Sequence, residues 1–100
     1  MTTNIQEKDG ILTATLSGEL DTAAAVEVEA ALQPLLESEG KDIVIDCTEL
    51  EYIASSGLRI LLSILKQAKS VGSKVTLKNV NDVIRDVFEL TGFIRIFEFE

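Results

Sequence analysis

The alternation of apolar and polar side chains near the N-terminus predicts two strands. Residues Ile11 to Leu16 alternate between apolar and polar types, and Asp9-Gly10 separates them from the segment Asn4 to Lys8. An Asp-Gly pair in this position is typical of a two-residue turn, because both residues tolerate positive φ. We therefore predict that the chain begins with an antiparallel hairpin.

The spacing of the apolar residues becomes helical after Gly18. Between Thr22 and Ser38, apolar side chains recur every three or four residues, at Ala25, Val28, Leu32, Leu35 and Leu36. Asp21 stands before this segment and is placed to accept hydrogen bonds from its first amides, so we predict that it is the N-cap. Pro34 has no amide hydrogen and crowds the carbonyl four residues back, which predicts a kink or an early end of this helix.

The middle of the chain combines a continuous apolar run with a helical pattern. The run Ile43-Val44-Ile45 lies within Asp42–Cys47 and is typical of a central strand that is covered on both faces. A second helix is predicted to end at Val71, with Gly72 in the terminating position. Its apolar residues follow the i, i+3, i+4, i+7 pattern and are Leu58, Leu61, Leu62, Leu65 and Ala68.

The remaining segments complete an alternation of strands and helices. They predict a strand over Val75–Leu77, a helix over Asn81–Leu90 that Gly92 closes, and a short strand over Ile94–Phe99. The residues of that helix expected to face inward are Val83, Val87 and Leu90. The fold class predicted from this order is α/β: a single domain with a mixed, mostly parallel sheet, an N-terminal β-hairpin and helices packed mainly on one face.

Composition excludes several classes of function. The chain has 17 acidic and 9 basic residues, a formal net charge of -8, no histidine and one cysteine. A domain this acidic is unsuited to binding nucleic acid. Without histidine, a zinc site or a Cys-His nucleophile pair cannot form within the chain, and one thiol cannot form an intrachain disulfide. We therefore expect no metal site and no cofactor.

Hydropathy and charge distribution bear on the cellular location of the protein and on the charge of its partner. No apolar run approaches the roughly 20 residues of a membrane span, and the first residues lack the pattern of a signal peptide, so we expect a cytoplasmic protein without membrane insertion. Residues 1–50 hold eleven acids and two bases, whereas residues 51–100 hold six acids and seven bases. This asymmetry is consistent with an acidic face for a basic partner, or simply with a solvated helix face.

The segment from Asp46 to Arg59 is rich in small and hydroxyl residues and joins a strand to the start of a helix. Free amides and the helix dipole favour an anion there, including a phosphate attached to Ser55 or Ser56. The simpler alternative is that one of these serines is the N-cap. No phosphate-binding glycine loop is present and no histidine could activate Ser55, so we expect no catalytic residue and no enzyme. Cys47 follows an apolar strand and is interpreted as a buried structural thiol.

Several motifs occur together in an order that resembles a known family. They are Gly18-Glu19-Leu20-Asp21, the strand Ile43 to Cys47, the segment Tyr52-Ile53-Ala54-Ser55-Ser56-Gly57-Leu58-Arg59, and Phe88 to Phe93 near the end. This combination resembles the STAS domain of bacterial anti-sigma factor antagonists over nearly the whole chain. The resemblance implies one STAS domain over residues 1–100.

The resemblance also implies a partner-switching function in signal transduction. In that family the unmodified protein binds an anti-sigma factor that is also a serine kinase, and it thereby regulates transcription indirectly. The kinase phosphorylates a serine that aligns with Ser55, and a PP2C-type phosphatase resets the system. The residues implied to form the partner-binding surface are Asp21, Ser55, Ser56, Gly57 and Leu58.

Two departures from the family pattern leave alternatives open. The residue before the acceptor serine is often Asp or Ser in the family and is Ala54 here. This difference leaves room for a second function, in which the domain is a regulatory subunit that docks on the ATPase of a lipid-transporting ABC system. Many relatives continue into another helix, so we also expect an uncovered surface on the sheet or third helix and weak self-association through it.

Overall fold

The N-terminal hairpin forms as predicted. The computed structural model describes all residues, 1–100, and in it β1 (Thr2–Lys8) pairs antiparallel with β2 (Ile11–Leu20). Asp9 and Gly10 connect the strands with φ angles of 53° and 78°, the left-handed values that a tight hairpin turn requires at both positions.

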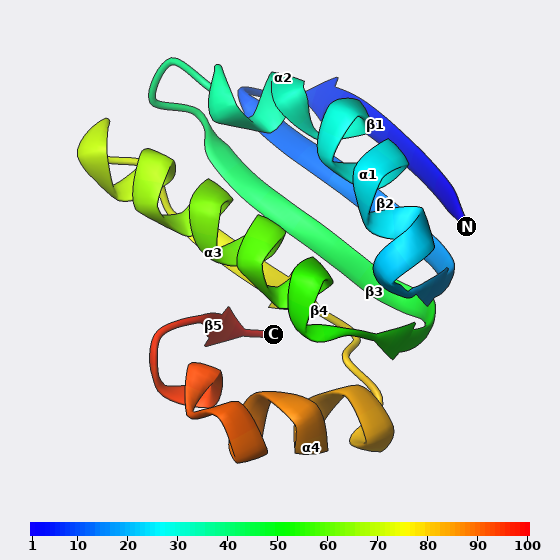
Figure 1. Cartoon of the computed structure of the whole chain (residues 1–100). Coiled ribbons are helices and arrows are strands. Elements are labelled where there is room, and N and C mark those ends of the chain that lie inside the picture. The colour runs from blue at the N-terminus through cyan, green and yellow to red at the C-terminus, as the bar shows by residue number, and fades with distance from the viewer.

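The other strands add to β2 in chain order. β3 (Asp42–Ile53), β4 (Val75–Lys78) and β5 (Glu98–Phe99) extend the sheet to the order β1-β2-β3-β4-β5, and all pairs after the hairpin are parallel. Figure 1 shows the helices mainly in front of this sheet, so the predicted mixed, mostly parallel sheet with one helical face is confirmed. Each parallel pair is connected through a helix, as parallel pairing demands.

The helices follow the predicted order, and the proline divides the first of them. α1 (Thr22–Ala31) and α2 (Gln33–Leu36) are separated at Leu32, and Pro34 lies in the first turn of α2, where its missing amide hydrogen costs nothing. α3 (Ser55–Ser70) lies across the middle of the sheet, and α4 (Asp82–Thr91) lies below it in the view of Figure 1. None of these helices is long and apolar enough to cross a membrane.

β3 corrects the prediction of a strand covered on both faces. Ile43, Ile45 and Cys47 are buried, whereas Val44 and Asp46 are only partly buried. The helices cover one face of the sheet, so alternate side chains of β3 remain accessible on the other face. The strand also continues to Ile53, six residues beyond the predicted end at Cys47.

α4 corrects the prediction about which side chains face inward. Val83 and Leu90 are 62% and 88% exposed, and the buried residues of the helix are Ile84 and Phe88. Of the three residues predicted to face inward, only Val87 packs against the core, and it is partly buried. The Phe88 ring meets Phe97 and Phe99 edge to face, with centroid separations of 5.6 and 5.5 Å. Burial of Phe88 among these rings sets the rotation of α4 and leaves Val83 and Leu90 outside.

The last predicted strand is much shorter than expected. Gly92 ends α4 with a φ of 80°, and a single 3₁₀ turn, η1 (Phe93–Arg95), follows it. Only Glu98–Phe99 of the predicted segment Ile94–Phe99 pairs with β4. The residues between Gly92 and Phe97 reverse the chain direction instead of extending the sheet.

Candidate modification and partner-binding site

The candidate site lies where β2 and β3 end side by side. Leu20 and Ile53 are paired residues at these ends, and the Ala54 amide donates a hydrogen bond to the Leu20 carbonyl at 2.9 Å. Each chain then enters a helix, with Asp21 before α1 and Ala54 before α3. The parallel pairing therefore brings Asp21 next to the start of α3, although 33 positions separate Asp21 from Ala54 in the sequence.

The first turn of α3 has no side-chain cap. The N-cap is Ala54, with extended φ and ψ of -88° and 169°, and Ser55 and Ser56 are already helical. The alternative that one of the serines is the N-cap is therefore wrong. The first amides of α3 and the positive end of its dipole remain without a side-chain partner, and this end of the helix favours an anion.

Ser55 is the accessible hydroxyl at this point. Its side chain is exposed and makes no hydrogen bond to any other residue. Asp21 is held beside the start of α3 because its Oδ1 accepts a hydrogen bond from the Ala24 amide at 2.8 Å, which makes it the N-cap of α1 as predicted. The structure thus places a free hydroxyl and a fixed carboxylate at the same edge of the sheet.

Gly57 allows α3 to approach the ends of β2 and β3 closely. A Cβ atom at this position would lie 2.7 Å from Cγ and 2.9 Å from Cδ2 of Leu20, and 3.0 Å from Cγ1 of Ile53. Such separations are shorter than carbon atoms tolerate, and both neighbours are buried. Gly57 therefore sets the position of the helix turn that carries Ser55.

The buried residues in the first turn of α3 narrow the surface that a partner can contact. Leu58 is 3% exposed and belongs to the core, and Gly57 is buried beneath the first turn of α3. Neither offers a side chain to a partner. Of the five residues that the resemblance implies for partner binding, the structure leaves Asp21, Ser55 and Ser56 at the surface. Ser56 is only partly exposed, and its Oγ is buried without a hydrogen-bond partner.

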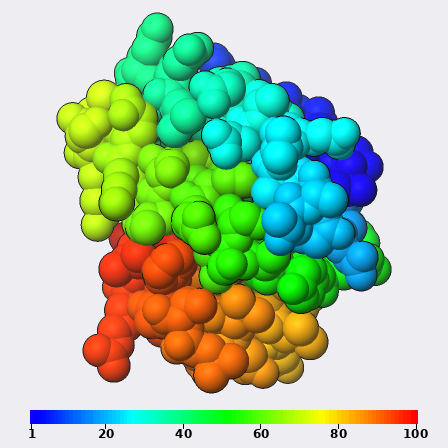
Figure 2. Space-filling model, in the orientation of Figure 1, coloured from blue at the N-terminus to red at the C-terminus, as the bar shows by residue number.

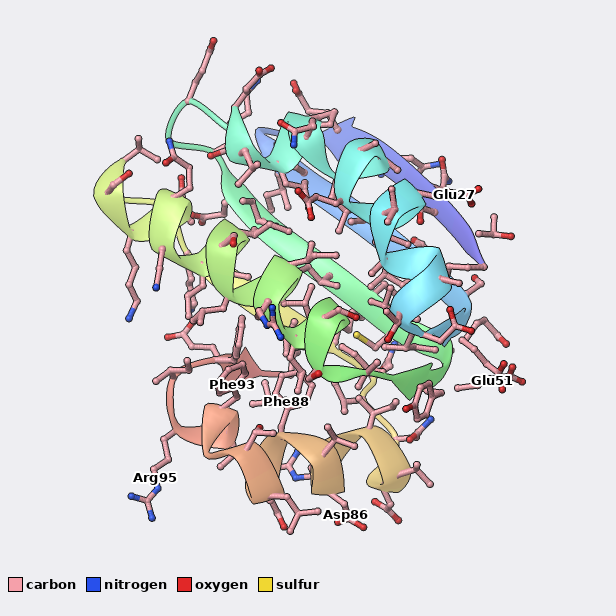
Figure 3. All side chains as sticks on the ribbon, in the orientation of Figure 1. Glu27, Glu51, Asp86, Phe88, Phe93 and Arg95 are labelled. Carbon is pink, nitrogen blue, oxygen red and sulfur yellow. The ribbon has the colours of Figure 1, made fainter.

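Four carboxylates, one of them that of Asp21, line a hollow next to the start of α1. The hollow has a volume of about 520 Å³, and its acidic residues are Glu19, Asp21, Glu27 and Glu51. Figure 3 shows Glu27 and Glu51 projecting on the same side of the molecule, from α1 and β3 respectively. The charge distribution along the sequence indicated an acidic first half, but the contribution of Glu51 appears only when β3 is placed beside β2.

A groove between α1 and α3 lies on the helical face that Figure 2 shows. It has a volume of about 420 Å³, a mainly apolar floor, and a rim that includes Val26, Glu29, Arg59 and Ser63. Val26 is 76% exposed. The buried residues of α1, Ala25 and Val28, are three positions apart, and Val26 does not fit this helical spacing. That mismatch is the sequence signal that could have indicated an exposed apolar residue here.

Cys47 is an inert thiol, as the sequence indicated. Its side chain is fully buried, and burial, together with the neighbouring Asp46, raises its pKa from 9.0 to about 12. The thiolate is the nucleophilic form, so this thiol lacks the reactivity of a catalytic cysteine.

We expect this shift to make the fold less stable at alkaline pH. The unfolded chain loses the Cys47 proton near pH 9.0 and the folded chain near pH 12, so the folded state binds more protons between these values. The free energy of unfolding should therefore fall as pH rises, by at most about 1.4 kcal/mol per pH unit from this group. Urea unfolding at several pH values measures this dependence, with Cys47→Ala as the control. If the free energy of unfolding fell equally with pH in the variant, the loss of stability would not come from the Cys47 thiol.

The model of one protein family matches residues 2–100 of the chain, and it describes the STAS domain. The chain belongs to the STAS domain family. The resemblance indicated by the sequence motifs is thereby confirmed over nearly the full length.

Curated relatives of this STAS domain carry consistent names. BtrV of Bordetella bronchiseptica, named as an anti-sigma factor antagonist, is 37% identical over 89 residues, which cover 89% of this chain and 77% of BtrV. The anti-sigma-B factor antagonist of Listeria monocytogenes is 32% identical over 83 residues, which cover 83% of this chain and 73% of the relative.

Solved structures confirm the fold. The anti-sigma factor antagonist SpoIIAA in its unphosphorylated form superposes with a TM-score of 0.81 at 20% identity, over 99% of this chain and 88% of SpoIIAA. SpoIIAA of Bacillus in its phosphorylated form gives a TM-score of 0.74, also at 20% identity, over 99% and 91% of the two chains. The STAS fold is thus shared with a protein whose structure is known in both states.

Proposed function

We propose that this STAS domain is an anti-sigma factor antagonist whose binding to an anti-sigma factor is switched by phosphorylation of Ser55. The observation that carries the proposal is the exposed, unbonded hydroxyl of Ser55 at the uncapped start of α3, beside Asp21. The names of the curated relatives support the function, and they favour it over a regulatory subunit of a lipid-transporting ABC system.

The physical effect of the modification falls on the interface. A phosphoryl group adds about -1.5 to -2 charges and three strong acceptor oxygens at Ser55. The uncapped amides at the start of α3 donate hydrogen bonds to such a group, so the fold survives the modification. A partner that packs against Ser55 must desolvate the added charge beside Asp21, and this cost weakens the complex.

The partner we propose is an anti-sigma factor that is also a serine kinase, and a PP2C-type phosphatase removes the phosphate. In this scheme the domain regulates by binding and does not itself catalyse a reaction. The exposure of Ser55 supports access of a kinase to its hydroxyl.

Phosphopeptide mapping of the protein isolated from its own cells tests the modification. We expect one phosphate on the peptide that contains Ser55, absent in Ser55→Ala and retained in Ser56→Ala, because the Ser56 Oγ is buried. A protein that carries no phosphate on this peptide under any growth condition would contradict the switch. Phosphate on Ser56 alone would reassign it.

The acidic hollow beside Asp21 supports a basic contact surface on the partner. We expect Glu27→Lys and Glu51→Lys each to weaken binding to the anti-sigma factor by about tenfold, mainly through slower association, and added salt to weaken the wild-type complex. The matched control is Glu37→Lys, which makes the same charge change at the end of α2, outside the hollow. Titration calorimetry at two ionic strengths measures the effect. An equal loss in all three variants would show that only net charge matters.

A further inference from the structure

Arg59 is an exposed cation one helical turn beyond Ser55. The two residues are four positions apart on α3, and side chains at this spacing lie on the same face of a helix, with Cβ atoms about 5–6 Å apart. Both residues are exposed, and Figure 1 shows α3 in front of the sheet, with its outer face uncovered. Because the Cα–Cβ bonds of a helix tilt toward its N-terminus, the Arg59 side chain starts in the direction of the turn that carries Ser55.

The Arg59 guanidinium has no acceptor within the chain. The protein contains two salt bridges, and neither of them includes Arg59. The backbone carbonyl of Arg59 accepts a hydrogen bond from Ser63 Oγ at 3.0 Å, but its side chain donates none. Glu29 of α1 lines the same groove and is not paired with it. The five N–H donors of the guanidinium are therefore available to an acceptor that is added nearby.

We propose that Arg59 is the internal partner of a phosphate on Ser55, and that its guanidinium binds the phosphate oxygens across one turn of α3. This inference rests on the proposed phosphorylation of Ser55 and adds the side chain that holds the phosphate once it is attached. A guanidinium suits this role because its planar fork matches two oxygens of a phosphate. The uncapped amides in the first turn of α3 supply further donors to the same group.

Asp21 acts on the same phosphate with the opposite sign. Its carboxylate is fixed at the end of β2 by the hydrogen bond from the Ala24 amide, and it repels a phosphate on Ser55. Arg59 attracts the phosphate from the second turn of α3. Repulsion at the strand ends and attraction along the helix both favour a phosphate turned toward Arg59. The modification is then held in one orientation on the surface that a partner must cover.

Phosphorus NMR of the full chain, synthesised with phosphoserine in place of Ser55, tests the pair. The chemical shift follows the loss of the second phosphate proton, which occurs at about pH 6 in an unperturbed phosphoserine. Arg59 stabilises the doubly charged phosphate, so the midpoint of the titration should rise by about 0.5 pH unit in Arg59→Gln. Arg59→Lys keeps the charge but loses the planar fork, so it should recover part of this change.

The matched control is Lys66→Gln, which removes the same charge from the outer face of the same helix. Lys66 is exposed and lies eleven positions beyond Ser55, about 16 Å along the helix axis. It should leave the midpoint at the wild-type value. A midpoint that does not change in Arg59→Gln overturns the pair. An equal rise in Lys66→Gln also overturns it, because only the net charge of the helix would then matter.

Thermal unfolding at pH 7.5 tests the same pair through stability. Phosphoserine in place of Ser55 should raise the melting temperature, and the increase should be about 2–4 °C smaller in Arg59→Gln than in the wild type. Arg59 is exposed, so its replacement leaves the core intact, and the unmodified form of each protein is the reference. An equal increase in both proteins contradicts the pair.

These measurements separate the pair from the proposed switch, because the phosphate is installed during synthesis. Absence of phosphate on Ser55 in the protein from its own cells would remove the switch. An unchanged titration midpoint in Arg59→Gln would remove the Arg59 pair and leave the switch in place.

Discussion

Ser55→Ala is expected to bind the anti-sigma factor within about twofold of the wild-type affinity, whereas Ser55→Asp should bind about 10- to 100-fold more weakly. Alanine removes a hydroxyl that has no hydrogen-bond partner in the domain, so nothing is lost on the free protein. Aspartate places a permanent negative charge beside Asp21, on the surface that the partner must desolvate. The uncapped start of α3 tolerates this charge, so the loss should appear in binding and not in folding.

Titration calorimetry with the purified anti-sigma factor measures the two affinities, and thermal unfolding of each variant verifies the fold. Ser70→Asp is the charge-matched control, because Ser70 is the exposed last residue of the same helix. It should leave binding unchanged. Equal affinities for Ser55→Ala and Ser55→Asp would contradict the switch, and an equal loss in Ser70→Asp would show that the charge acts without regard to position.

The second large effect is expected at Gly57. Gly57→Ala should lower the free energy of unfolding by about 1–2 kcal/mol, because the new Cβ overlaps Leu20 and Ile53 by more than the helix propensity of alanine recovers. Since the clash pushes the first turn of α3 away from the strand ends, Ser55 should move with it and binding of the anti-sigma factor should weaken as well. Urea unfolding measures the first effect and calorimetry the second.

A double-mutant cycle with Leu20→Ala identifies the cause of the Gly57 effect. Leu20 supplies the two nearest atoms, so removing its side chain makes room for the Cβ. In the Leu20→Ala background, Gly57→Ala should become neutral or stabilising, although Leu20→Ala alone costs about 2–5 kcal/mol. Additive effects of the two substitutions would mean that the steric explanation is wrong.

Local signals in the sequence were sufficient where one residue decides the geometry. Asp9-Gly10 formed the hairpin, Asp21 capped α1, and Pro34 divided the first helix. On α4 the apolar residues occupy a wide arc that includes Val83, Val87 and Leu90 as well as the buried pair Ile84 and Phe88. Spacing alone cannot choose between two adjacent apolar faces, and the choice depends on the aromatic rings of Phe97 and Phe99 in a later segment.

The candidate site shows the same division between local and tertiary information. The motif placed Asp21 and Ser55 correctly at one edge of the sheet, because the carboxyl ends of adjacent parallel strands meet there. Leu58 belonged both to the apolar helical pattern and to the implied partner surface, and the structure buries it in the core, as the helical pattern indicated. The extension of β3 to Ile53 also escaped prediction, because its pairing with β2 shifts register after Thr15 and again after Gly18.

Ala54 has a consequence for the energetics of the whole domain. An alanine at the N-cap forgoes about 1 kcal/mol that a Ser, Thr, Asp or Asn would contribute to α3. A phosphate on the next residue supplies the acceptor oxygens that the N-cap lacks, so the modification and the folding equilibrium are thermodynamically linked. The form of the protein that releases its partner is then also the form whose central helix is held more firmly.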